Sequence, residues 1–194
     1  MSSAGLQVTL RVLAVSHESM RVAYAVRNAS STPVLVLDRR WDPALEALDP
    51  AWVEVDLADV TAWLSRMHVV VPPEVLLSEP RLPYGRVLDA GAVSETELTV
   101  ALPLQERGSL DAVYEQGPVE GDAGLTSVDA LLMRVGWVAM PSVDTLPPES
   151  RDEVVIEGER LHWLSKEFLD EAQRVARSEP VAVTLVGRLR GSIA

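Results

Sequence analysis

Three histidines are the side chains of this chain best suited to bind a metal ion or to move a proton near neutral pH. They are His17, His68 and His162, and each stands alone in its part of the sequence. The spacings His-x-His and His-x-x-x-His, which bring two imidazoles to one side of a metal, do not occur. We therefore predict that the protein binds no metal and no cofactor, and that His17 is an exposed turn residue.

Other patterns that could carry catalysis are weak. Acidic pairs such as Asp38 with Asp42 could do acid–base work or hold calcium, but with 29 Asp and Glu residues in 194 such pairs arise by composition. There is no cysteine nucleophile, no Gly-x-Ser-x-Gly and no phosphate-binding glycine loop. The sequence predicts a protein that is not an enzyme. A less favoured alternative is an enzyme with a site built from His68, His162 and acids.

The cluster Asp38-Arg39-Arg40-Trp41-Asp42 follows an apolar run directly. Tryptophan and arginine are enriched among the residues that dominate protein–protein binding energy. We predict that Arg39, Arg40 and Trp41 form a protein interface. The alternative is that Trp41 folds back on the domain while the two arginines form surface ion pairs. Phe168 is a fourth interface candidate, because it lies on the apolar side of an expected helix.

The charge of the chain limits its partners. Lys plus Arg total 17 against 29 Asp plus Glu, so the formal net charge is −12. This charge argues against binding to nucleic acid or to an anionic membrane. The expected partner is another protein, for which a basic one is a candidate, or a second copy of the chain. No signal peptide or long apolar run is present, so the default localisation is cytoplasmic.

Alternation of apolar and polar residues indicates strands along most of the chain. They are expected at 6–15, 20–28, 34–37, 52–57, 68–71, 75–77, 95–102, 131–140, 154–156 and 181–186. The strands at 20–28 and 34–37 are separated by a short polar turn, so we expect antiparallel neighbours at the centre of the fold. The expected core consists of Val8, Leu10, Val22, Tyr24, Val26, Val36, Leu98, Val100, Val135 and Val183.

Helices are expected to be few and short. The clearest is 165–178, where Ser165 can cap the helix and Leu164, Phe168, Leu169, Ala172, Val175 and Ala176 form one apolar stripe. A helical turn is expected at 43–48, and a short helix or irregular crossover at 56–67. Long loops are expected at about 78–94, 107–127 and 141–152.

These elements predict a mainly β fold, a single antiparallel sandwich domain over 1–194 with about seven to nine strands and one or two inserted helices. The opening, an alternating strand followed by Asn28-Ala29-Ser30, Pro33 and an apolar strand, resembles bacterial immunoglobulin-like sandwiches. Since such folds carry many functions, two classes stay open. The preferred one is a non-catalytic adaptor, assembly subunit or accessory factor, and the alternative is an acidic inhibitor or immunity-type protein that occludes a basic enzyme.

Overall fold

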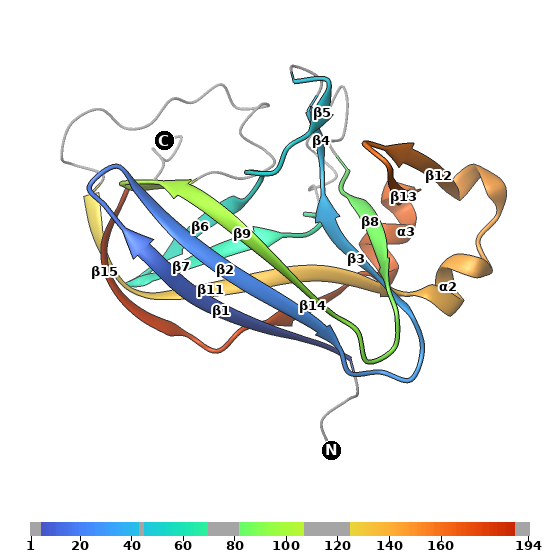
Figure 1. Cartoon of the computed structure of the whole chain (residues 1–194), viewed down its shortest axis with the longest axis horizontal. Coiled ribbons are helices and arrows are strands. Elements are labelled where there is room, and N and C mark those ends of the chain that lie inside the picture. Colours follow the sequence, from blue (N-terminus) through green and yellow to red (C-terminus); the bar gives the residue numbers. More distant parts are fainter. Residues whose placement is uncertain (1–4, 43–44, 70–81, 107–124, 189–194) are drawn as a thin grey trace.

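The computed structural model describes residues 5–42, 45–69, 82–106 and 125–188, and strands account for 63% of the structure. Two β-sheets pack face to face, with few and short helices, which confirms the predicted fold class (Figure 1). Sheet A is antiparallel and has the strand order β1-β2-β9. Its strands are β1 (Leu6–Val15), β2 (Ser19–Asn28) and β9 (Val93–Ala101).

Sheet B is larger, with ten strands in the part of the chain that the structure describes. They are β3 (Val34–Arg39), β6 (Glu54–Ala58), β7 (Thr61–Arg66), β8 (Tyr84–Leu88), β10 (Leu104–Gln105), β11 (Leu125–Ala139), β12 (Arg151–Ile156), β13 (Glu159–Leu164), β14 (Arg174–Arg177) and β15 (Val181–Arg188). A separate hairpin consists of β4 (Trp41–Asp42) and β5 (Ala47–Leu48).

Strand β11 is the central strand of sheet B, as its long apolar sequence predicts. One of its edges pairs with β15 and then with β14, and the other edge pairs with β7 and then with β3. Arg66 of β7 lies opposite Val135, and Leu37 of β3 lies opposite Gly136. The carboxyl ends of β7 and β3 therefore meet at neighbouring positions of β11. We call this place, where β3 stops pairing with β11 after Leu37 and β7 ends at Arg66, the fork.

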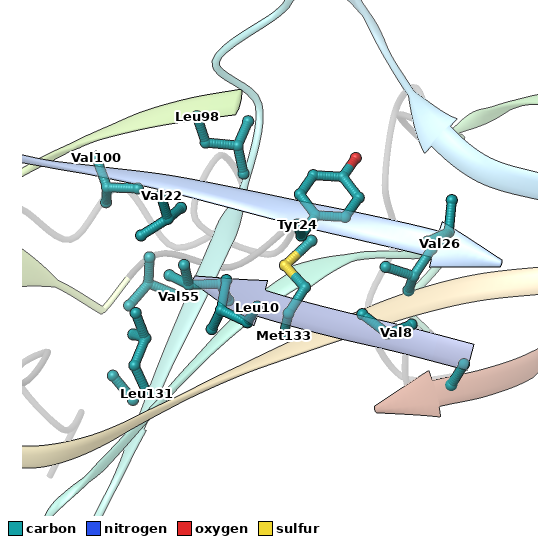
Figure 2. Packing of buried hydrophobic residues seen from close by; sticks show 14 of the residues in the cluster. Val8, Leu10, Val22, Tyr24, Val26, Val55, Leu98, Val100, Leu131 and Met133 are labelled. Atoms are coloured by element: carbon teal, nitrogen blue, oxygen red, sulfur yellow. The ribbon is translucent and has the colours of Figure 1, made fainter. Parts of the chain in front are cut away.

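The main hydrophobic core lies between the two sheets. Nine of the ten predicted core residues are buried in it, and Val183 is partly buried against it. Figure 2 shows side chains of β1, β2 and β9 meeting Val55, Leu131 and Met133 of sheet B. The alternation in β1, β2 and β9 is thus a direct record of which side faces the core.

The predicted pairing of 20–28 with 34–37 is wrong, because β2 and β3 belong to different sheets. The chain crosses from sheet A to sheet B at residues 29–33. There the buried Asn28 side chain donates to Thr32 O at 2.8 Å and to Leu88 O at 3.0 Å. Val34 and Val36 of β3 enter the main core, while Leu35 and Leu37 enter a second core on the opposite face. A strand buried on both faces belongs in the middle of a covered sheet.

The second core lies between sheet B and helices α2 (Met140–Asp144) and α3 (Lys166–Ala172). The predicted helix at 165–178 begins correctly, with the Ser165 side chain accepting from Phe168 N, but it ends at Ala172. At the end of the helix, the Gln173 side chain bonds the backbone of His68. His68 N donates to Gln173 Oε1, and Gln173 Nε2 donates to His68 O, both at 2.8 Å. A Cβ on Gly136 would lie 2.5 Å from Gln173 Oε1, so glycine permits this close approach.

Several other local predictions are also wrong. The expected helical turn at 43–48 contains β5, and the expected helix at 56–67 is the β6–β7 hairpin, whose turn includes Asp59 with φ of 53°. The helical spacing was read from Leu57, Val60, Thr61, Leu64 and Met67, but Leu57 and Leu64 lie on opposite strands of the hairpin, where they pair with Ala62 and Val55.

The structure also contradicts some of the predicted loops and part of the strand predicted at 68–71. Other predictions, such as the strand at 75–77, lie outside the described residues. The expected loop at 78–94 contains β8, and 141–152 contains most of α2, a 3-10 turn at Pro148–Ser150 and the start of β12. Residues 68–69 are not in a strand. The strand expected at 75–77 and the loop expected at 107–124 lie outside the described residues, and residues 125–127 of that loop begin β11.

Candidate protein-binding hairpin and its buried support

The predicted interface residues Arg39, Arg40 and Trp41 lie where the chain leaves β3 and forms the β4–β5 hairpin. Trp41 lies opposite Leu48, and Asp49 N donates to Arg40 O at 2.8 Å, which extends the pairing toward the base of the hairpin. Figure 1 shows β4 and β5 at the top of the molecule, projecting beyond the two sheets. Trp41 is partly buried and belongs to neither hydrophobic core.

Arg39 and Arg40 are both engaged within the molecule. Arg39 Nη1 lies 3.1 Å from Asp38 Oδ1, and Arg39 Nε donates to Glu159 Oε2 at 3.0 Å. Burial would lower the pKa of Arg39, but the carboxylates of Asp38 and Glu159 outweigh it and raise that pKa. The Arg40 guanidinium lies 4.9 Å from the ring centre of Trp52 and 3.9 Å from Glu54 Oε1. The alternative interpretation expected Arg39 and Arg40 to form surface ion pairs. Both arginines do form ion pairs, but these are largely buried.

Asp38 is the centre of a buried polar network at the fork. Its side chain is fully buried and receives two hydrogen bonds from Arg86, Nε to Oδ1 at 3.0 Å and Nη2 to Oδ2 at 2.8 Å. The Tyr24 hydroxyl also donates to Oδ2 at 3.3 Å. Burial, reinforced by the charge of Asp38, raises the pKa of Tyr24, so the phenol stays protonated and can donate. Strands of both sheets therefore meet at this carboxylate.

Arg66 joins the two arms of the chain that carries the hairpin. On the outgoing arm it donates from Nη1 to Asp38 O at 3.1 Å. On the returning arm it donates from Nη2 to Pro50 O at 2.6 Å and from Nε to Trp52 O at 2.7 Å. The guanidinium is buried and has no carboxylate among these partners. Pro50 and Trp52 lie outside any strand, between β5 and β6, and Arg66 satisfies their carbonyl groups together with that of Asp38.

The hairpin presents an apolar side chain to solvent. Leu45 is 60% exposed, and it lies between β4 and β5 next to Glu46, whose φ is 48°. A rigid scaffold that carries a projecting loop is a common arrangement for binding sites. The arrangement can therefore offer Leu45 and Trp41 to a partner while the arginines and Asp38 hold the base in place.

Phe168, the fourth interface candidate, lies on α3. It is partly buried and packs against the second core. Leu169 is the buried residue of that helix. The apolar side of α3 thus covers the chain's own sheet, in keeping with the marginal stability of an isolated helix of this length.

The histidines have separate surroundings. His68 is buried and its Nε2 lies 2.6 Å from Asp170 Oδ1, while Lys166 Nζ donates to Asp170 Oδ2 at 2.7 Å. His162 Nε2 lies 3.9 Å from Glu153, and the exposed His17 is next to Glu18. Within the described ranges no three His, Cys, Asp or Glu residues gather as they would around a metal ion.

Changing Asp170 to Asn is expected to destabilise the protein by about 1–2 kcal/mol at pH 7. Burial would raise the pKa of Asp170, but hydrogen bonds from Lys166 and His68 outweigh it and lower that pKa. A carboxylate with a lowered pKa in the folded state stabilises above its unfolded pKa, about 3.9, and this stabilisation is lost as the pH falls through the folded value.

The measurement for Asp170 is urea unfolding of parent and variant between pH 7 and pH 3. The gap between the two free energies should shrink on acidification. Glu149→Gln, at an exposed position, is the control and should show little gap at pH 7. An Asp170→Asn gap that stays constant with pH would contradict the ion-pair interpretation.

Sequence reasoning identified Arg39, Arg40 and Trp41 but not the residues that hold them. Tyr24 was assigned to the core only, and Arg66 and Arg86 were not singled out. In the sequence, the one feature that sets Arg66 apart is its place at the end of an alternating segment. A charged residue at a strand end is usually exposed, so this feature did not indicate a buried role.

Comparison with protein-family models, with curated proteins and with solved structures finds no match. Among the described residues, no helix has the length and apolar character needed to cross a membrane. The function must therefore be argued from the geometry of this chain.

Proposed function

We propose that this protein is a non-catalytic β-sandwich that binds another protein, as an adaptor, assembly subunit or accessory factor, and that the β4–β5 hairpin is its binding element. The observation that carries the proposal is the position of Arg66, which holds both arms of the hairpin from a buried site. A buried ionic network adds little net stability compared with apolar packing, so its use here fits a need for one defined geometry.

A non-catalytic role agrees with where the ionisable groups lie. Asp38 and Arg66 are 0% and 2% exposed, and their hydrogen bonds go to other groups of the protein. His68 is 4% exposed and paired with Asp170. Groups enclosed in this way support structure, whereas catalytic groups must reach a substrate. The resemblance to bacterial immunoglobulin-like sandwiches and a cytoplasmic location remain parts of this proposal.

The test is Leu45→Asp. Proteins that co-purify with the wild-type chain from its native host are identified, purified and titrated with wild type and variant. We expect the variant to bind the purified partner at least about tenfold more weakly, as for an interface hot spot. Val93→Asp is the matched control, since Val93 is 61% exposed against 60% for Leu45.

Equal affinity of Leu45→Asp and wild type for that partner would exclude the hairpin as the binding element. If no protein co-purifies and the chain neither self-associates nor binds a partner, the protein-binding function itself is wrong. Inhibition of one basic enzyme by the wild-type chain would favour the inhibitor class instead.

A further inference from the structure

Trp63, Arg134 and Arg177 form a cationic and aromatic cluster on sheet B, which we call the Arg–Trp patch. They lie on the neighbouring strands β7, β11 and β14. The Arg134 guanidinium lies 5.0 Å, and that of Arg177 5.6 Å, from the ring centre of Trp63. Their register places them on the face opposite to Met133 and Val135, which enter the main core. The patch is therefore on the outer face of the sheet.

Two like charges meet in this patch. Arg134 and Arg177 lie directly opposite each other in the β11–β14 pair, an arrangement that costs stability. Burial lowers the pKa of Arg134, and the charge of Arg177 lowers it further. Arg134 is held by hydrogen bonds to Asp56 and to Ser65 Oγ. The patch thus holds two guanidinium groups against the one carboxylate of Asp56, which pairs with Arg134, and it keeps an excess of positive charge on a chain whose net charge is −12.

Arg177 is the accessible cation of the patch. Its side chain is exposed, and within the described ranges no hydrogen bond or ion pair joins it to a carboxylate. Val175 lies two residues earlier on β14, so it is on the same face, and it is 37% exposed. A cation, an indole ring and an aliphatic side chain are therefore available together.

We propose that the Arg–Trp patch is a second docking surface, which binds a segment of a partner protein in which a carboxylate stands beside an apolar side chain. The Arg177 guanidinium matches a carboxylate in shape and charge. Trp63 and Val175 offer apolar area next to it. The carboxylate of the occupant forms an ion pair with Arg177. Within the described residues, no carboxylate forms that pair.

The charge of the whole chain favours a short acidic segment over a polyanion. At physiological salt the field of a surface charge is screened within about 8 Å, so one carboxylate responds mainly to the patch. A nucleic acid would extend over the acidic remainder of the surface and be repelled. The occupant is thus a peptide segment and not a phosphate polymer.

The probe for this proposal is a hexapeptide of alternating glutamate and leucine, titrated at physiological salt and followed by NMR shifts. Peptides with lysine or glutamine in place of glutamate, and inorganic phosphate, are the comparison ligands. We expect Arg177→Glu to weaken binding of the glutamate peptide about tenfold or more, because a charge-assisted contact becomes repulsive. Arg27→Glu, the same charge change at an exposed position of β2, should leave binding unchanged.

Several results would overturn the proposal. They are no binding of the glutamate peptide, equal binding of the lysine or glutamine peptide, and equal binding by Arg177→Glu. Phosphate binding as tight as peptide binding would make the patch a simple anion site. If light scattering shows a dimer that Arg177→Glu dissociates, the occupant is a second copy of the chain. Leu45→Asp should keep the peptide affinity, so this test is independent of the hairpin.

Discussion

Replacing Arg66 by methionine is expected to destabilise the protein by about 3–5 kcal/mol, because the carbonyl groups that its guanidinium satisfies lose their donor. Methionine has a similar length but leaves Asp38 O, Pro50 O and Trp52 O without the donor that satisfies them here. The bonds to Asp38 O and Trp52 O are buried, and each such acceptor left without its donor costs about 1–3 kcal/mol, whereas the bond to Pro50 O is only partly buried and adds less.

The Arg66 variant is measured by urea unfolding, with Arg27→Met as the control because Arg27 is exposed. Hydrogen exchange adds a local measurement. Amides at the base of the hairpin, such as Asp49 N, should exchange faster in Arg66→Met than amides of β1, because Arg66 holds both arms of the hairpin. A loss of stability below about 1 kcal/mol would contradict the role assigned to Arg66.

Asp38→Asn is expected to cost about 3–5 kcal/mol, since it leaves Arg86 buried without its carboxylate. Arg86 makes two hydrogen bonds to that carboxylate, and the Asp38 side chain is 0% exposed. The neutral amide can accept only one bond with the geometry that the guanidinium offers, and it removes the negative charge that faces Arg39 and Arg86.

A double-mutant cycle separates the pair from its surroundings. We expect Asp38→Asn combined with Arg86→Met to lose much less than the sum of the two single changes, because the second change removes the unpaired cation. The free energies come from urea unfolding at pH 7. Strict additivity would show that Asp38 and Arg86 do not stabilise each other.

The buried network also explains why the composition of 38–42 suggests an interface there but gives no sign of the residues that support it. Arg39, Arg40 and Trp41 are adjacent in the sequence, so their residue types alone raise the possibility of an interface. Tyr24, Asp38, Arg66 and Arg86 come from β2, β3, β7 and β8. The arrangement of strands within sheet B brings Asp38, Arg66 and Arg86 together, and the packing of sheet A on sheet B adds Tyr24.

The strands that the sequence determined by itself are those in which one face is buried. In β1, β2 and β9 each core residue is followed by an exposed or partly exposed one over most of the strand, so local alternation is sufficient to find them. The β-rich class, the part of β11 from 131 to 139 and the cap at Ser165 were also local properties.

Three features were decided by the tertiary structure alone: the strands that pair with β3, the end of α3 and the fork. Four consecutive apolar residues in β3 indicate burial but not which strands lie beside it, and β11 and β8 come from distant parts of the chain. The apolar stripe of α3 continues past Ala172, yet the backbone is extended at Gln173 and the next residues pair with β11 as β14, while the Gln173 side chain bonds His68, 105 residues away. Arg66 and Asp38 are buried because two strands leave β11 at neighbouring positions, and an unpaired carbonyl at that point needs a donor that only the folded chain can supply.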